Sequence, residues 1–247
     1  GLLGLEGGDT LSGGGGDDIL SGGAGSDSLE GGQGVDRAVY TTSPAPVDVA
    51  LARAVQSGGD AEGDRLIGIE ALAASGGDDR LAGDARVTGN LLEGGDGDDT
   101  VTGGGGRDSF GGDFLALDGD RITDFGSDDA ILVFDRAAGA LTADLADDGT
   151  DTTLTLDDGA GTAVRIALDG LFEGATVDGT DAGGARIAAR RAEPEGAAAV
   201  IRGTDQDDTL LIAQNGTYLG LAGQDTLLLS PVARPDAVSI LEGRPGD

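Results

Sequence analysis

Large aliphatic residues recur along the chain at nine-residue intervals, each of them set between stretches of glycine and aspartate. Four consecutive nonapeptides begin at Gly4 and read GLEGGDTLS, GGGGDDILS, GGAGSDSLE and GGQGVDRAV. The second and third fit the pattern G-G-x-G-x-D-x-U-x at every fixed position, where U is a large aliphatic residue. The first lacks only the second glycine, and the fourth has Ala38 at the aliphatic position. A fixed period of this kind predicts a repeat architecture.

The same period returns twice further along the chain. A second series, from Ala74 to Gly111, reads ASGGDDRLA, then two extra residues, then ARVTGNLLE, GGDGDDTVT and GGGGRDSFG. A third and weaker series consists of GTDQDDTLL from Gly203 and GLAGQDTLL from Gly220. The chain begins on the tail of one nonapeptide and closes on GRPGD, the opening of another. We therefore expect both ends to be cut from a longer array.

Each nonapeptide predicts one turn and one short strand. Two or three residues around the aliphatic position, such as Ile19-Leu20-Ser21, form the strand, and the leucine points inward. The six residues Gly-Gly-x-Gly-x-Asp form the turn, where glycine permits positive φ angles and close backbone approach, which gathers carbonyl oxygens at one edge. Two nonapeptides make one coil of a solenoid, so equivalent turns stack every 18 residues. The predicted fold class is all-β, a parallel β-roll.

Stacking of the turns also stacks their aspartates. It places Asp9 over Asp27 and Asp18 over Asp36, one strand spacing of roughly 4.8 Å apart. Carboxylates this close repel each other strongly unless a hard cation lies between them. Calcium prefers flexible, oxygen-only ligation with about six to eight ligands, unlike magnesium or zinc. The pattern therefore predicts several Ca²⁺ ions bound between turns.

Composition explains why a cation is needed. The 247 residues include 49 glycines, and 46 acidic residues stand against 15 basic ones, which gives a formal net charge of −31. Ordering the glycines costs backbone entropy, and self-repulsion opposes compaction. At cytosolic calcium levels we therefore expect the chain to stay unfolded. Because extracellular modules bind calcium at about 10⁻⁴–10⁻³ M, calcium outside the cell is expected to drive folding.

The residue types that are missing exclude several functions. The chain has no histidine, cysteine or lysine, so it has no ordinary zinc site, Ser-His-Asp triad, cysteine nucleophile, Walker A loop or Schiff-base lysine. The strong negative charge repels nucleic acid and anionic lipid. No apolar run approaches the roughly 18 residues that span a membrane. Paired carboxylates can perform glycosidase chemistry, but many equivalent pairs suit ligation better, so we expect no catalysis.

The nonapeptides resemble the repeats-in-toxin (RTX) family of calcium-binding repeats. The resemblance implies a parallel β-roll with calcium between adjacent turns, export by a type I secretion system, and folding on meeting external calcium. It also implies that the residue at position six of each repeat is a metal ligand. Asn90 at that position keeps an oxygen but loses the charge. The candidate ligands are Asp9, Asp18, Asp27, Asp36, Asp79, Asn90, Asp99, Asp108, Asp208 and Asp225.

Backbone carbonyls of the turn glycines complete the candidate ligand set. These glycines are Gly13, Gly14, Gly16, Gly22, Gly23, Gly25, Gly31, Gly32, Gly34, Gly94, Gly95, Gly97, Gly103, Gly104 and Gly106. Two departures are expected to break the 18-residue register: the insertion Gly83-Asp84, and a spacing of 17 residues between Asp208 and Asp225.

Six segments are expected along the chain. They are an RTX block (residues 1–43), spacer rungs (44–73), a second block (74–111), a β-rich capping segment (112–181), a linker or short helix (182–202) and a truncated third block (203–247). The spacer is expected to begin with an edge strand at Val47–Leu51. In the capping segment we expect a buried strand at Ile131–Phe134, a hairpin of Thr152–Leu156 with Val164–Leu168, and a core of all five phenylalanines.

Two functions are compatible with these features. The preferred one is a non-enzymatic, calcium-binding module of a secreted or cell-surface bacterial protein, which serves as scaffold, spacer, or adhesin or surface-layer segment. Its expected partners are calcium ions and, further, another copy of itself or a cell-surface partner. The alternative is the secretion-and-folding appendage of a type I-secreted enzyme or toxin, such as a protease, lipase, epimerase or haemolysin. The return of the repeats at Gly203 argues against this alternative.

Overall fold

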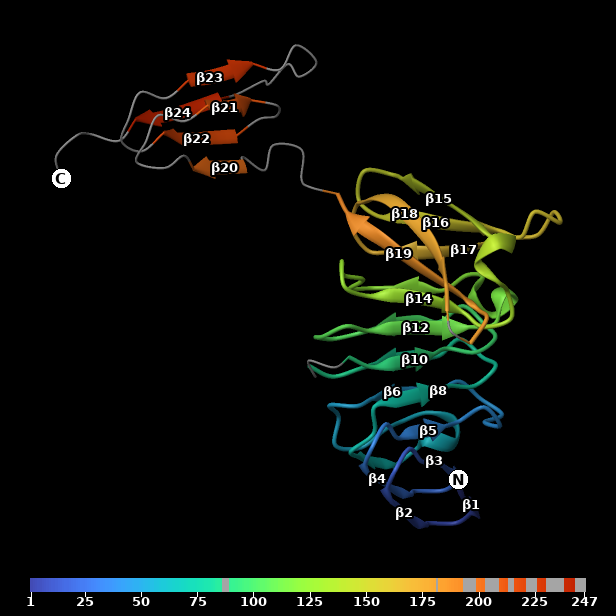
Figure 1. The fold of residues 1–247 in the computed structure, drawn as a ribbon. Helices are drawn as coiled ribbons and strands as arrows, with labels where there is room; N and C mark the ends of the chain where they lie inside the picture. The colour runs from blue at the N-terminus through green and yellow to red at the C-terminus, as the bar shows by residue number, and fades with distance from the viewer. Residues whose placement is uncertain are drawn as a thin grey trace, which may run out of the picture. The chain divides into compact units, whose positions relative to one another are not determined.

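The computed structural model describes residues 1–85, 89–180 and 182–192, and beyond them five strands. The chain forms two compact units, Gly1–Ala192 and Glu193–Asp247. Among the residues that the structure describes, no helix has the length and hydropathy to cross a membrane. The predicted all-β parallel roll is confirmed in the first unit (Figure 1).

Parallel strands stack along the roll in the order of its coils. One sheet holds the strands β1 (Leu2–Glu6), β3 (Ile19–Ala24), β5 (Arg37–Val39), β8 (Ala71–Ala73), β10 (Leu91–Glu93), β12 (Ser109–Gly112) and β14 (Ala130–Val133). The alternate strands belong to two further sheets. These strands are β2 (Thr10–Gly15), β4 (Ser28–Gln33) and β7 (Arg65–Ile67) in one, and β6 (Asp48–Ala50), β9 (Arg80–Ala82), β11 (Thr100–Thr102) and β13 (Arg121–Ile122) in the other.

The aliphatic positions of the repeats stack on one another inside the roll. Leu2 pairs with Leu20 between β1 and β3, and Leu11 pairs with Leu29 between β2 and β4. Leu20 and Leu29 are fully buried. Because one inward residue per strand fills the interior of each coil, the predicted 18-residue stacking of the first series is confirmed.

The insertion at Gly83-Asp84 lengthens one coil without breaking the stack, contrary to the expectation. Val101 pairs with Leu81 between β11 and β9, twenty residues apart, and Leu92 pairs with Leu72 between β10 and β8. The next coil returns to 18 residues, since Leu92 pairs with Phe110. Extra residues in a turn leave the strand pairing unchanged, because the hydrogen-bond register depends only on the strands.

The spacer continues the roll with longer connections. Strand β6 lies at the end of its sheet, as expected of the edge strand predicted at Val47–Leu51. Strand β7 pairs with β4, and β8 pairs with both β5 and β10. Leu66, Ile69 and Leu72 are buried within the common core, which confirms that these residues extend the stack.

Antiparallel strands close the far end of the roll. Strands β15 (Thr142–Asp147), β16 (Thr152–Asp157) and β17 (Ala163–Leu168) form a meander that adds to β13. The predicted hairpin is confirmed as β16 and β17. The chain then returns through β18 (Phe172–Gly179) and β19 (Ala185–Arg191) to the edge of β14 (Figure 1).

The expected linker or short helix at residues 182–202 is wrong for its first half. Ala185–Arg191 form β19, which pairs antiparallel with β14 through Ile187 and Ile131. Its buried positions alternate, with Ala185, Ile187 and Ala189 facing the core. Alternation of small apolar and charged residues is a strand pattern, and it outweighs the helix propensity of alanine and arginine here.

Four of the five phenylalanines form the expected capping core. Phe110, Phe125 and Phe172 are buried, and the ring centroids are 5.9 Å apart for Phe110–Phe125 and 5.6 Å for Phe125–Phe172. Phe114 is also buried. Phe134 is the exception: it follows the last residue of β14 and is 43% exposed.

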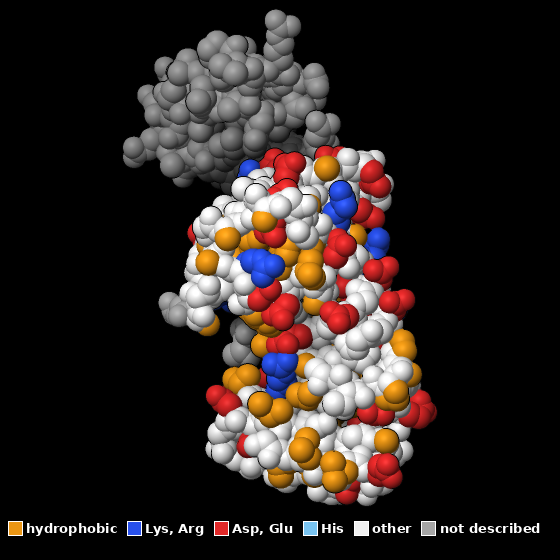
Figure 2. All heavy atoms as spheres, turned by 90° about the vertical axis from the view of Figure 1, so that its right-hand side faces the viewer, with side chains coloured by type: hydrophobic (Ala, Val, Ile, Leu, Met, Phe, Trp, Pro, Cys, Tyr) orange, Lys and Arg blue, Asp and Glu red, His pale blue; other side chains and the backbone are white. Residues whose placement is uncertain are grey.

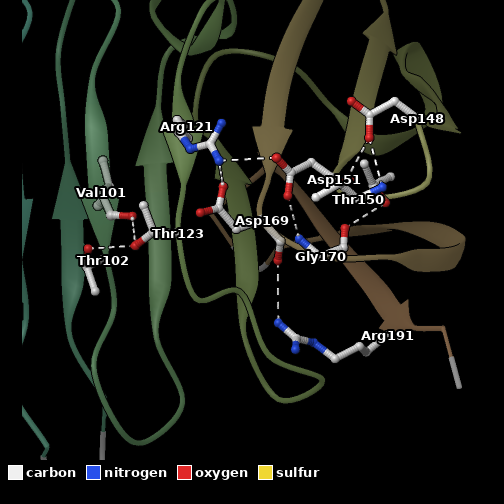
Figure 3. A network of polar contacts seen from close by, with 11 residues as sticks. Val101, Thr102, Arg121, Thr123, Asp148, Thr150, Asp151, Asp169, Gly170 and Arg191 are labelled. Atoms are coloured by element: carbon white, nitrogen blue, oxygen red, sulfur yellow. Dashed lines mark hydrogen bonds and ion pairs between the residues drawn. The ribbon is translucent and has the colours of Figure 1, made fainter. Parts of the chain in front are cut away.

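A network of ion pairs joins the last parallel strand to the cap. Arg121, in β13, lies 2.5 Å from a carboxylate oxygen of Asp169 and 3.2 Å from one of Asp151 (Figure 3). Arg191 donates to the carbonyl oxygen of Asp169 at 3.4 Å and lies over the Phe172 ring. The two arginines therefore connect β13, β19 and the loops at Asp151 and Asp169.

The second unit repeats the parallel pairing. Its strands are β20 (Ala199–Arg202), β21 (Thr209–Ile212), β22 (Gly216–Gly220), β23 (Thr226–Leu229) and β24 (Val238–Glu242). One sheet runs β20-β22-β24 and the other pairs β21 with β23, with Thr209 opposite Thr226. The predicted ligands Asp208 and Asp225 and the closing GRPGD lie outside the described residues.

Candidate metal sites in the turns

Each position-six side chain reaches back to the preceding coil. One carboxylate oxygen of Asp27 accepts the backbone N–H of Asp9 at 2.7 Å, and Asp36 accepts that of Asp18 at 2.8 Å. In the second block, Asp99 accepts the N–H of Asp79 at 2.8 Å. The side chains therefore form a hydrogen-bonded ladder along the stack, called the carboxylate ladder below. Asp108 continues it by accepting the N–H of Asn90 at 2.7 Å.

Four acidic residues that the repeat pattern misses belong to the same ladder. They bind the backbone N–H groups of Asp27, Asp36, Asp99 and Asp108 at 2.7, 2.9, 3.1 and 2.8 Å respectively, and they are Asp64, Glu70, Asp120 and Asp129. Each stands two positions before an inward aliphatic residue: Leu66, Leu72, Ile122 and Ile131. The usable sequence signal is therefore D-x-U or E-x-U without the glycines.

The ladder leaves a second row of oxygens without partners. One oxygen of each carboxylate accepts the N–H, but the Oδ2 atoms of Asp9, Asp27, Asp36 and Asp99 are buried and have no hydrogen-bond partner. Asp27, Asp36 and Asp99 are at most 2% exposed. A buried charged oxygen without a partner costs several kcal/mol in a protein interior, on the order of its desolvation penalty. These atoms are the strongest indication of a missing cation.

The first glycine of each turn leaves room for that oxygen. A Cβ atom on Gly22 would lie 2.1 Å from Oδ2 of Asp27, and one on Gly94 would lie 1.9 Å from Oδ2 of Asp99. The second glycine brings two coils together: a Cβ on Gly23, at φ +90°, would lie 2.0 Å from the carbonyl oxygen of Leu5 in the coil before. Carbonyl and carboxylate oxygens of neighbouring coils are thus held at one edge of the roll.

The comparisons with known proteins agree with this geometry. The family model of the RTX calcium-binding nonapeptide repeat matches residues 3–38 and 88–114, in four copies. The chain carries RTX repeats. No curated protein matches the chain. RTX repeats form calcium-binding β-rolls and are structural rather than catalytic modules, so this β-roll is a calcium-binding module.

The donor set of the RTX turns fits calcium. Among the described residues no group of three or more acidic, histidine or cysteine side chains converges, so a cation between turns depends on backbone carbonyls for most of its ligands. Carbonyl oxygens with few carboxylates suit calcium, whereas zinc takes nitrogen and sulfur ligands. The partnerless Oδ2 atoms would supply the charged ligands.

Burial and like charges raise the pKa of several ladder carboxylates. Burial, with further contributions from the neighbouring Asp120, Asp79 and Asp78, raises the pKa of Asp99 to about 8, although the N–H of Asp79 opposes the rise. Burial raises the pKa of Asp108 to about 6, with Asp129 and Asp124 adding to it. A divalent cation would reverse these shifts, since an opposite charge favours the ionised form.

Two position-six residues differ from the other RTX turns because all their oxygens have partners. Asp79 accepts hydrogen bonds from the backbone N–H and the hydroxyl of Ser75, and from the N–H of Val47. The side-chain oxygen of Asn90 accepts the N–H of Asp84, and its amide nitrogen donates to the carbonyl oxygen of Glu70.

The segment after Phe110 closes the last RTX turn. The Asp124 carboxylate accepts the backbone N–H groups of Gly103 and Gly104 at 2.7 and 2.8 Å, one on each oxygen. Four residues earlier, Asp120 occupies the ladder. The two aspartates of the D-x-I-x-D-F motif therefore hold the second RTX block from the side of the cap.

Proposed function

We propose that the chain is a calcium-triggered folding module of an exported bacterial protein, folded outside the cell and unfolded inside it. The observation that carries this proposal is the row of buried Oδ2 atoms without partners on Asp9, Asp27, Asp36 and Asp99. They stack in a chain of net charge −31. Without a cation, each adds a desolvation cost and like-charge repulsion to the entropy of ordering the glycines.

The proposed calcium ligands lie in the turns that keep their glycines. They combine the carboxylates of Asp9, Asp18, Asp27, Asp36, Asp99 and Asp108 with carbonyl oxygens of the glycines at positions one, two and four of the same turns. The expectation for Asp208 and Asp225 in the second unit is the same. A bound ion would neutralise the carboxylates and hold adjacent coils together, so its binding free energy becomes folding free energy.

Circular dichroism tests the proposal. In EDTA at low salt the chain is expected to show little β signal, and titration with CaCl₂ should restore the signal with a midpoint of about 0.1–1 mM, as for other extracellular modules. Magnesium at the same concentration should restore little of it, since magnesium demands a rigid octahedral shell. A full β signal in EDTA at low salt would contradict the proposal.

Within this function, we propose a structural role as scaffold or spacer in a surface protein. The pairing of β20–β24 supports it, because parallel strands resume after the cap of the first unit. An appendage that only assists export would need no further block. Sedimentation velocity with and without calcium tests the role: calcium-dependent assembly into larger species supports a lattice or adhesin segment, and a monomer at all calcium concentrations favours the appendage.

A further inference from the structure

The ladder carboxylates divide into two kinds according to their second oxygen. Asp27, Asp36 and Asp99 keep a buried Oδ2 without a partner. Asp64 and Asp79 are equally buried, at 0% and 2% exposure, but protein groups bind both of their oxygens. The difference concerns the place that a cation would take, so it bears on which rungs need one.

At Asp64 a tyrosine takes that place. Its Oδ1 accepts the N–H of Asp27 at 2.7 Å, as in every ladder rung, and its Oδ2 accepts the hydroxyl of Tyr40 at 3.0 Å. Tyr40 is 2% exposed. The hydroxyl is a fixed donor that is supplied from the neighbouring coil of the roll, and a buried tyrosine O–H requires a partner of this kind.

At Asp79 a serine takes that place. The repeat ASGGDDRLA has Ala74 and Ser75 where complete RTX turns have two glycines. The carboxylate accepts the backbone N–H of Ser75 at 2.7 Å and its hydroxyl at 2.9 Å. The space that the first glycine leaves open beside Oδ2 in the other turns is here occupied by a Cβ atom, and the carboxylate is satisfied within its own turn.

The spacer between these two rungs also satisfies its remaining polar groups. Gln56 is 2% exposed, its oxygen accepts the N–H of Ala50 at 2.8 Å, and its nitrogen donates to the carbonyl oxygen of Arg53 at 3.1 Å. Its apolar core consists of Val47, Val49, Leu66, Ile69 and Leu72, all at most 9% exposed. Burial of this size stabilises a coil by the ordinary hydrophobic effect.

We propose that Asp64 and Asp79 are rungs without calcium, and that residues 40–82 form a segment of the roll that stays folded when calcium is removed. Tyr40 and Ser75 supply the hydrogen bonds that calcium supplies at the glycine turns. The inference rests on the proposed calcium-triggered folding and limits it to the coils on either side. It also assigns Asp79, a candidate ligand by its position in the repeat, to a purely structural role.

Hydrogen–deuterium exchange of the whole chain in CaCl₂ and in EDTA tests this division. On removal of calcium, amides of residues 1–36 are expected to exchange at least about tenfold faster. The amides of Val47, Asp64, Ser75 and Arg80 should keep their protection. Equal loss of protection in both segments overturns the inference and leaves calcium-triggered folding intact. No loss in either segment contradicts the proposed function itself.

Two variants sharpen the test. Tyr40→Phe leaves Oδ2 of Asp64 buried and without a partner, so exchange of the spacer amides in EDTA should accelerate by about 10- to 100-fold, the usual effect of an unsatisfied buried acceptor. Ser75→Ala should do the same around Asp79, whereas the matched control Ser12→Ala removes an exposed hydroxyl and should change nothing. Unchanged exchange in both Tyr40→Phe and Ser75→Ala overturns the inference.

Discussion

Leu5 is the sole non-glycine residue with a positive φ angle, +84°, in the part of the chain that the structure describes. It stands at position two of the first RTX turn, where the following turns have Gly14 and Gly23 at φ +92° and +90°. This conformation costs a branched side chain about 1–2 kcal/mol. The leucine gains little in return, because it is 70% exposed, near other exposed apolar side chains at this end of the roll (Figure 2).

Leu5→Gly is therefore expected to stabilise the calcium-loaded roll by about 1 kcal/mol, since it relieves this strain. Urea denaturation in CaCl₂ measures the effect. The matched control is Leu3→Gly, two residues earlier in β1 and 72% exposed, without a positive φ angle. There a glycine should destabilise the strand by about 0.5–1 kcal/mol. Destabilisation by Leu5→Gly of the same size as the control would show that φ is not strained in solution.

The raised pKa values predict how the calcium-free protein responds to pH. The pKa of Asp99 is about 8 and that of Asp120 about 7, both mainly because of burial, against 3.8 in the unfolded chain. The folded state then binds more protons than the unfolded state between these values. Stability is fully present below pH 3.8 and is lost as the pH rises through about 7 to 8.

In EDTA, the β signal in circular dichroism is therefore expected to be larger at pH 5 than at pH 8. In CaCl₂ the trend reverses, because protons compete with calcium for the same carboxylates. A calcium-free signal that falls on acidification, or a calcium affinity that rises, would contradict the assignment of these groups. The comparison needs constant ionic strength, because screening also depends on salt.

At the level of strands and turns, the sequence predicts most of the RTX blocks. The inward leucines and the positions of the stacked aspartates follow from the nine-residue period, because in a solenoid the period alone fixes both. The period does not find Asp64, Glu70, Asp120 and Asp129. Their turns have other lengths and other residues, and only the acidic residue two positions before an inward aliphatic remains. A hydrogen bond to the next coil requires that residue and no particular turn.

The cap shows the opposite limitation. Its composition predicts β-structure and a phenylalanine core, but the pairing of β19 with β14 depends on contacts between residues far apart in the chain. Alanine and arginine favour helices by intrinsic propensity. The alternation of Ala185, Ile187 and Ala189 toward the core decides the outcome, which is a tertiary effect that local propensity does not contain.

Ile187→Ala tests the role of β19. Ile187 is fully buried and lies opposite Ile131, so its truncation is expected to destabilise the first unit by about 2–5 kcal/mol. Arg190→Ala is the matched control in the same strand, because the Arg190–Glu173 ion pair is exposed and such pairs contribute roughly 0–1 kcal/mol. Thermal denaturation in CaCl₂ measures both. Equal, small effects would mean that these residues behave as a linker in solution.

For the whole molecule, charge and vacancy at the ladder make separate demands. Acidic side chains outnumber basic ones over the face of the roll and cap in Figure 2, in keeping with the net charge of −31. Salt screens that exposed charge, and at 1 M the Debye length falls to about 3 Å. Screening does not provide a ligand for a buried Oδ2 atom.

In EDTA, about 1 M NaCl is therefore expected to compact the chain without restoring the full β signal. Small-angle scattering measures the radius of gyration, and circular dichroism measures the strands. Millimolar CaCl₂ at low salt should achieve both. If NaCl alone restored the β signal as fully as calcium does, general repulsion, and not the partnerless oxygens, would be the barrier to folding.

The ladder partners are separated by very different lengths of chain. Asp9 and Asp27 are 18 residues apart, Asp79 and Asp99 are 20 apart, and Asp27 and Asp64 are 37 apart, yet each pair makes the same hydrogen bond. For protein evolution and for engineering, this separates phase from length. A foreign peptide inserted between two rungs alters only the length and can be carried as a surface loop, whereas the loss of one ladder carboxylate disturbs the phase of every coil above it.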